Sequence, residues 1–134
     1  MRRYLFDSNA LNAFLDGRSP FADRAREARL RGDHLGTCEL VVAELCFGLE
    51  FSSSREQNLE RLWRGLSRLR SWPFDRSAAV EYARIAAELR RRGRPMQVVD
   101  MMLAAVALSV GGTVITTDTD LQAVPGLSVQ NWTT

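Results

Sequence analysis

The stretch Arg2-Arg3-Tyr4-Leu5-Phe6-Asp7-Ser8-Asn9 contains the pattern that decides the fold. Its apolar part has the length of a buried strand, and it stops abruptly at an acidic residue followed by two small polar ones. Ser8 and Asn9 favour helix N-termini, so they predict a helix that begins there and continues through Leu15. Burying a carboxylate is costly unless something compensates the charge, so Asp7 at the end of a core strand needs an explanation.

The same change from strand to helix recurs along the chain. Strands that alternate with helices indicate a parallel α/β sheet with helices on both faces, and 134 residues are enough for one domain with a buried core. Further strands are expected at 34–37, 113–116 and 127–131, with a short strand or connector at 72–74. Helices are expected at 21–30, 39–49, 55–69, 75–92 and 99–110, with a turn of helix at 120–123.

Two more acidic residues stand alone in apolar segments. Glu44 is the only charged residue within 40–49, and Asp100 is the only one within 95–117. Asp100 has a simple structural explanation as a helix cap. Glu44 lies inside an expected helix, where no helix end needs it, so the corresponding explanation is an ion pair with a buried arginine.

Asp7 and Asp118 both follow expected strands. Active sites of parallel α/β sheets lie at the carboxyl ends of the strands, which is where this pattern puts both residues. Asp7 alone is explained by helix capping, and Asp118 with Asp120 by a polar turn. Four separate explanations are then needed for the four acids, whereas one cluster explains them all.

A cluster of carboxylates requires a cation. Two unit charges about 5 Å apart repel by roughly 3 kcal/mol at an effective dielectric constant near 20. A ligand set made only of oxygen atoms favours a hard ion such as Mg²⁺ or Mn²⁺. Carboxylates around a divalent ion suit phosphodiester hydrolysis, because the metal polarises the phosphoryl oxygen and generates hydroxide at neutral pH.

Composition excludes several other classes of protein. All eighteen basic residues are arginine, so the lysine of a P-loop NTPase is missing. The single histidine, His34, rules out a metal-free ribonuclease mechanism that uses a histidine pair. Cys38 and Cys46 lack the spacing of a zinc site or a disulfide framework, which indicates reduced core residues. No signal peptide or membrane-spanning segment is expected, so the predicted location is the cytoplasm.

Four segments together resemble the motifs of the PIN-domain ribonucleases, particularly the VapC toxins of toxin–antitoxin pairs. Each segment contains one of the four acids, and they follow one another in order and at family-like spacing over essentially the whole chain. They are Tyr4-Leu5-Phe6-Asp7-Ser8-Asn9-Ala10-Leu11, Val41-Val42-Ala43-Glu44-Leu45-Cys46-Phe47-Gly48, Val99-Asp100-Met101-Met102-Leu103-Ala104-Ala105 and Val114-Ile115-Thr116-Thr117-Asp118-Thr119-Asp120-Leu121, followed by Val124-Pro125-Gly126-Leu127 and Asn131-Trp132.

The resemblance implies both a fold and a function. The fold is the PIN-like three-layer arrangement, in which helices flank a central parallel sheet of four to five short strands. The implied activity is that of a Mg²⁺-dependent endoribonuclease, with Mn²⁺ as an alternative, that leaves a 5′-phosphate and a 3′-hydroxyl. Family members cleave RNA, commonly at loops of tRNA or rRNA, and a small antitoxin protein neutralises them.

The resemblance also implies roles for individual residues. Asp7 and Asp100 become direct metal ligands, and Asp118 completes the site. Glu44 holds metal-bound water or a second ion, and Asp120 is a marginal fifth acid. The polar residues that support these ligands by hydrogen bonds are Ser8, Asn9 and Thr116.

Two residues depart from the family pattern and two other functions compete with it. Gln97 stands where glycine is common and Leu121 where an aromatic residue is usual, which puts the shape of the loops in doubt. A haloacid-dehalogenase-like phosphatase requires a second aspartate at the position of Asn9 and a late lysine, and a receiver domain requires the same lysine. A non-catalytic PIN-like module that binds RNA or protein is the alternative from a different class.

Two surface features indicate partners. An apolar stripe on the helix at 55–69 is wide for a small core, so part of it is expected to form a homodimer contact, and another groove to accept a helix of the antitoxin. The arginine-rich run at 88–94 either binds RNA phosphates or complements the dipole of a helix C-terminus. The stripe consists of Leu59, Leu62, Trp63, Leu66 and Leu69.

Overall fold

The computed structural model describes residues 1–134 and contains one five-stranded parallel sheet, as the sequence predicts. The strand order is β3-β2-β1-β4-β5, so the chain builds the sheet outward from β1 in one direction and then in the other. The strands are β1 (Arg3–Phe6), β2 (His34–Thr37), β3 (Arg70–Ser71), β4 (Thr113–Ile115) and β5 (Ser128–Gln130).

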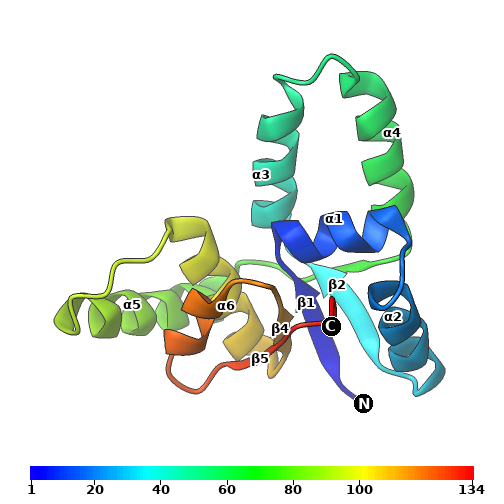
Figure 1. Ribbon diagram of the computed structural model, residues 1–134. Helices are drawn as coiled ribbons and strands as arrows, with labels where there is room; N and C mark the ends of the chain where they lie inside the picture. The colour runs from blue at the N-terminus through cyan, green and yellow to red at the C-terminus, as the bar shows by residue number, and fades with distance from the viewer.

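Six α-helices and one 3₁₀ helix connect the strands. Figure 1 shows α1 and α2 to one side of the strands, α5 and α6 to the other, and a hairpin of α3 and α4 that rises beyond the carboxyl end of the sheet. None of the helices is long and apolar enough to cross a lipid bilayer. Their bounds are α1 (Ser8–Asp16), α2 (Phe21–Leu30), α3 (Glu39–Leu49), α4 (Arg55–Leu66), α5 (Arg76–Arg91), α6 (Val98–Val110) and η1 (Thr119–Ala123).

The central strand β1 is the most deeply buried. Leu5 and Phe6 are fully buried and Tyr4 nearly so, because β2 and β4 pair with β1 on either side and helices cover it. Trp132 from the C-terminal tail packs against the rings of Tyr4 and Phe6 at centroid distances of 4.9 and 5.8 Å. Such tilted aromatic contacts stabilise a core beyond the burial of area alone. The C-terminal tail therefore stabilises β1, the strand that Asp7 follows.

The structure corrects the sequence prediction around the third strand. The helix expected to reach Leu69 ends at Leu66, and the amides of residues 68 and 69 instead form tight bonds three residues back. The strand is Arg70–Ser71, and residues 72–74 form the connector. Pro73 has no amide proton for a sheet ladder, whereas β3 can approach β2 closely because Gly36 has no side chain.

Candidate active site

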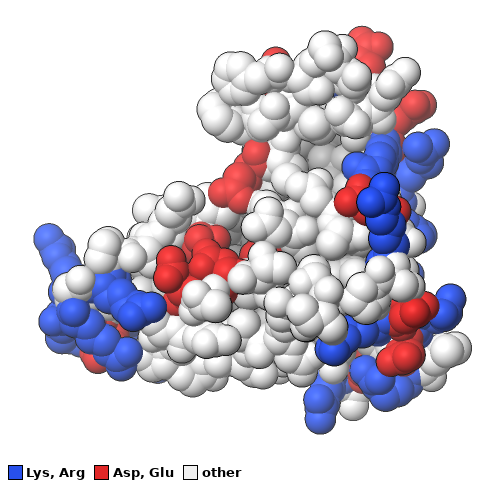
Figure 2. Space-filling model, viewed as in Figure 1, with Lys and Arg blue, Asp and Glu red and all other residues white.

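One pocket gathers the acidic residues that the sequence singled out. It has a volume of about 560 Å³ and opens at the carboxyl ends of β1 and β4, beside the middle of α3 and the N-terminal end of α6. Figure 2 shows acidic side chains in a hollow between the α3–α4 hairpin and the α5–α6 side of the molecule. The lining residues are Asp7, Ser8, Asn9, Glu44, Pro95, Met96, Gln97, Asp100, Asp118 and Asp120.

Asp7 serves both as a helix cap and as a wall of the pocket. Its Oδ1 accepts the backbone N–H of Ala10 at 2.8 Å, so Asp7 caps α1, not Ser8 and Asn9 as expected. Its Oδ2 accepts the hydroxyl of Thr116. Burial raises the pKa of the Asp7 carboxyl, the two hydrogen bonds oppose that effect, and nearby acids add to it. Asp7 therefore both caps α1 and lines the acidic pocket.

Thr116 connects two of the acids. Its buried hydroxyl donates to Asp7 and accepts the backbone N–H of Asp118 at 2.9 Å. A hydroxyl can donate one proton and accept others, so a single side chain fixes both positions. The predicted supporting role of Thr116 therefore has a geometric basis in the ends of β1 and β4.

Glu44 turns into the pocket from α3. It is half-buried and accepts the hydroxyl of Ser8, and it forms no ion pair with any arginine. The alternative explanation of Glu44, a structural ion pair with a buried arginine, is therefore wrong. Because Ser8 is free from capping α1, its hydroxyl is available to bridge α1 and α3.

Asp100 lies in the first turn of α6 but does not cap it. The residue at the N-cap position is Gln97, so the capping explanation of Asp100 is wrong. Burial and then, in order of size, the charges of Asp118, Glu44, Asp7 and Asp120 together raise the pKa of Asp100 to about 6. A carboxyl whose pKa responds to four other acids lies within the field of all of them.

The last two acids lie on the turn after β4. Asp118 caps η1 by accepting the N–H of Asp120 at 2.9 Å, as the polar-turn explanation predicts, and it also lines the pocket. Asp120 is exposed, and its carboxylate lies 3.8 Å from the guanidinium of Arg94. That is the only ion pair formed by any acid of the pocket.

The donor set fits a hard divalent cation. The pocket presents carboxylate, hydroxyl and amide oxygens, and neither histidine nor cysteine lines it. No three side chains of the types His, Cys, Asp and Glu are arranged to hold one ion directly. Mg²⁺ usually binds through one or two carboxylates and retains several waters, so it does not require such a cage. Four of the five acids have no basic partner, so the pocket carries uncompensated negative charge.

The structure adds three residues that the acidic pattern does not indicate. Pro95, Met96 and Gln97 form the wall of the pocket between α5 and α6. The sequence distinguishes Gln97 only as a replacement of the glycine that is common in the family. Gln97 is the N-cap residue of α6, three residues before Asp100, and lines the pocket together with it, which no charge pattern reveals.

Comparison with known proteins identifies the family. The model of the PIN domain family matches residues 4–127. The chain belongs to the PIN-domain family. The match spans all four acidic segments, and the five-stranded parallel sheet with its six flanking helices is the PIN-like fold. This assignment removes the support for a dehalogenase-like phosphatase.

Relatives within the family carry the VapC name. The chain is 30% identical over 133 residues to a "tRNA(fMet)-specific endonuclease VapC" from Salmonella typhimurium, which covers 98% of this chain and 99% of the relative. It is 31% identical to a protein of the same name from Shigella flexneri, with the same coverage. Among solved structures, a DNA-bound VapBC from Salmonella typhimurium matches with a TM-score of 0.89 at 27% identity, covering 98% of this chain and 99% of that one.

Proposed function

We propose that this PIN-domain protein is a Mg²⁺-dependent endoribonuclease, with Mn²⁺ as an alternative ion, and the toxin of a toxin–antitoxin pair. The observation that carries the proposal is the pocket of five carboxylates at the ends of β1 and β4, only one of which has a basic partner. The names of the VapC relatives support ribonuclease activity, and the solved VapBC complex supports an antitoxin partner.

The site residues have distinct tasks in this proposal. Asp7 and Asp100 are the direct ligands of the metal, and Asp118 completes its site. Glu44 holds metal-bound water or a second ion. A bound Mg²⁺ supplies Lewis-acid polarisation of the phosphodiester and lowers the pKa of water. Asp7 can act as a ligand without reorganising its surroundings, because hydrogen bonds to Ala10 and Thr116 already fix both of its oxygens.

The products and the substrate class follow from the same proposal. Attack of water in line on the phosphorus, with the P–O3′ bond breaking and the departing 3′ oxygen taking up a proton, leaves the 5′-phosphate and 3′-hydroxyl that the family resemblance implies. The RNA to test first is initiator tRNA, because two relatives of about 30% identity are named for specificity toward tRNA(fMet).

The decisive experiment sequences RNA 5′ ends after incubation of total RNA with the purified protein. Defined new ends are expected with Mg²⁺ and the wild-type chain, and none with EDTA or with Asp100→Asn. Asp23→Asn serves as the matched control, because Asp23 occupies the third position of α2 as Asp100 does of α6, away from the pocket. Identical ends with Asp100→Asn would refute the site assignment, and no ends under any condition would favour a non-catalytic module.

The α3–α4 hairpin is the proposed antitoxin surface. A groove of about 300 Å³ between α1, α3 and α4 is lined by apolar side chains and flanked by polar ones. An amphipathic helix of a small antitoxin can place its apolar side chains there. A small reading frame adjacent to this gene is expected, and co-purification of its product with the chain tests the proposal. The apolar side chains of the groove are Leu15, Leu45, Leu49 and Leu62.

The hairpin also carries exposed aromatic residues that favour a homodimer. Phe47 and Phe51 are 68% and 78% exposed and contact each other edge-on, and Trp63 is 51% exposed. Within the predicted stripe on α4, Leu62 is buried in the core, whereas Trp63 faces solvent. One part of the stripe therefore packs in the core and the other is available for the dimer contact. Light scattering is expected to show a dimer, and a strict monomer at high concentration would reject this contact.

A further inference from the structure

The C-terminal end of α5 carries a run of arginines that comes just before residues lining the acidic pocket. Arg90 and Arg91 end the helix, Arg92 and Arg94 follow it, and the next residues, 95–97, line the pocket. Figure 2 shows basic side chains gathered over α5 beside the acidic hollow. This arginine rim (Arg91, Arg92 and Arg94) is therefore the basic surface nearest the candidate site along the chain.

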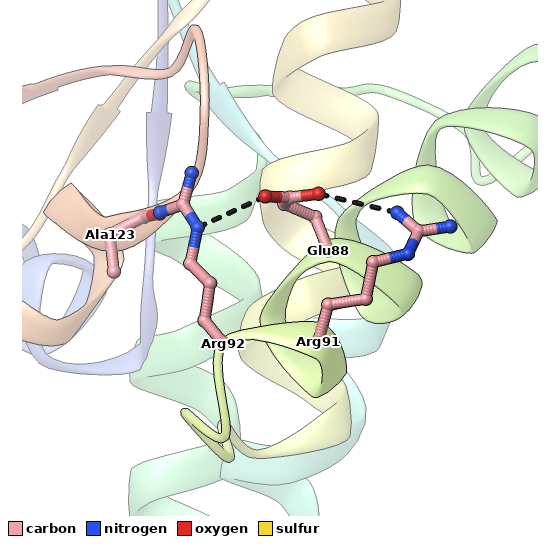
Figure 3. A network of polar contacts seen from close by, with 4 residues as sticks. All are labelled: Glu88, Arg91, Arg92 and Ala123. Carbon is pink, nitrogen blue, oxygen red and sulfur yellow. Dashed lines mark hydrogen bonds and ion pairs between the residues drawn. The ribbon is translucent and has the colours of Figure 1, made fainter.

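Arg92 links the end of α5 to the last residue of η1, the turn that carries Asp120. Arg92 donates through Nε to Glu88 at 3.1 Å and through Nη1 to the carbonyl of Ala123 at 3.3 Å (Figure 3). The other oxygen of Glu88 accepts Nη1 of Arg91 at 3.3 Å. Because one carboxylate serves two guanidinium groups, the cluster retains a positive charge.

The helix dipole does not explain Arg94. Cations favour the last turn of a helix, and that accounts for Arg90 and Arg91. Arg94 lies beyond the end of α5, where Gly93 adopts a φ of 62° and the N–H of Arg94 donates to the carbonyl of Leu89 at 2.9 Å. This Schellman-type ending fixes the backbone of Arg94. Its guanidinium lies 3.8 Å from Asp120, at the edge of the pocket.

A polyanionic substrate needs cations beside this pocket. Five carboxylates line it, and one divalent ion neutralises two of their charges. The remaining charge repels a phosphate backbone, so phosphates that flank the reacting bond require basic partners nearby. The exposed guanidinium of Arg94, which has only a weak surface ion pair to give up, is the one cation in contact with an acid of the pocket.

We propose that the arginine rim binds the RNA backbone at phosphates flanking the scissile bond, with Arg94 as the contact closest to the site. The inference rests on the proposed ribonuclease function and adds the side from which the RNA enters. Arg94 and Arg91 contact phosphate directly, whereas Glu88 and Arg92 act as positioning residues that hold the rim against η1.

Binding measured without cleavage tests the rim. A short fluorescent single-stranded RNA of mixed sequence is titrated with each variant in EDTA over a range of salt concentrations. Arg94→Ala is expected to weaken binding about three- to tenfold. It should also reduce the magnitude of the negative slope of log association constant against log salt concentration by about 0.7. Arg91→Ala with Arg94→Ala is expected to lower it by about 1.4. Arg94→Lys should restore most of the slope, because lysine still binds phosphate as a point charge.

Arg76→Ala is the matched control. Arg76 is an exposed arginine at the opposite end of α5, so its removal changes the net charge equally but leaves the rim intact. Its slope should match that of the wild type. Rim variants that bind like the wild type, in a protein that cleaves RNA, would overturn the rim and leave the proposed function standing. A wild-type chain that neither binds nor cleaves RNA would overturn both.

Discussion

Replacing Asp100 by Asn separates an electrostatic cluster from a structural residue. Burial and four neighbouring acids raise the pKa of Asp100 from 3.8 to about 6. A difference of this size corresponds to about 3 kcal/mol at 1.36 kcal/mol per pKa unit. Asp100 is only half-buried, so solvent screening reduces this to about 1–2 kcal/mol. The dipole of α6 favours a negative charge in its first turn by about 0.5 kcal/mol, which leaves a net gain for the variant of about 1 kcal/mol.

The size of this stability difference between Asp100→Asn and the wild type depends on pH. Between pH 3.8 and about 6, native Asp100 binds more protons than the unfolded chain does, so this residue makes the wild type less stable as pH rises. At pH 7 in EDTA, Asp100→Asn is therefore expected to melt about 3–5 °C above the wild type. Well below pH 3.8 the carboxyl is neutral in both states and the advantage should disappear. The same Asp100→Asn substitution should also abolish RNA cleavage in Mg²⁺.

Melting curves across this pH range, with Asp23→Asn in parallel, check the reasoning. The control removes a carboxylate from the same position of α2, where Arg26 is its partner at 2.8 Å, and should lower stability by a few tenths of a kcal/mol. An Asp100→Asn variant that melts at or below the wild-type temperature at pH 7 would refute the electrostatic account.

Three further predictions concern the site and the sheet. Saturating Mg²⁺ or Mn²⁺ at 100 times its dissociation constant should stabilise the wild type by about 2.7 kcal/mol but not Asp100→Asn, and a calorimetric scan without any shift would contradict metal binding. Thr116→Val should lower the free energy of unfolding by about 1–3 kcal/mol. The variant also loses a hydrogen bond that favours ionised Asp7, so the acid limb of the cleavage–pH profile should shift to higher pH, and an unchanged profile would argue against this link. Gly36→Ala should lower the free energy of unfolding in urea by about 1–3 kcal/mol or more, because the new Cβ would lie 2.3 Å from the carbonyl oxygen of Arg70. Gly48→Ala in α3 is the control: Gly48 is exposed, no atom lies within 4 Å of the new Cβ, and the variant should be more stable by about 0.5–1 kcal/mol.

Much of the architecture could be predicted because local patterns and tertiary structure agree. The alternation of short apolar strands with helices was enough for a parallel sheet, and acids that follow strands were enough to place Asp7 and Asp118 at one edge. The convergence of Glu44 and Asp100 on that edge followed from their isolation in apolar segments. Their roles as metal ligands stay a prediction.

What the sequence did not reveal depends on contacts between distant segments. The end of α4 at Leu66 is set by the pairing of β3 with β2, which helix propensity does not record. Ser8 has the composition of a helix cap, yet its hydroxyl is used by Glu44 on another helix. The approach of Arg94 to Asp120 likewise exists only once α5 packs against α6 and the turn after β4.

The strand order has a consequence for the timing of synthesis. β1 is made well before its second partner, β4, which is separated from it by more than a hundred residues, and the hydrogen bond from Thr116 to Asp7 spans 109 residues. A ribosome that adds about 5–20 residues per second needs roughly 5–20 s to cover that distance. During this interval β1 has one free edge and the nascent chain lacks both Asp118 and the hydroxyl that orients Asp7. The chain therefore completes its acidic pocket only after β4 and Asp118 have been made, so a nascent polypeptide that has not reached them carries no assembled site.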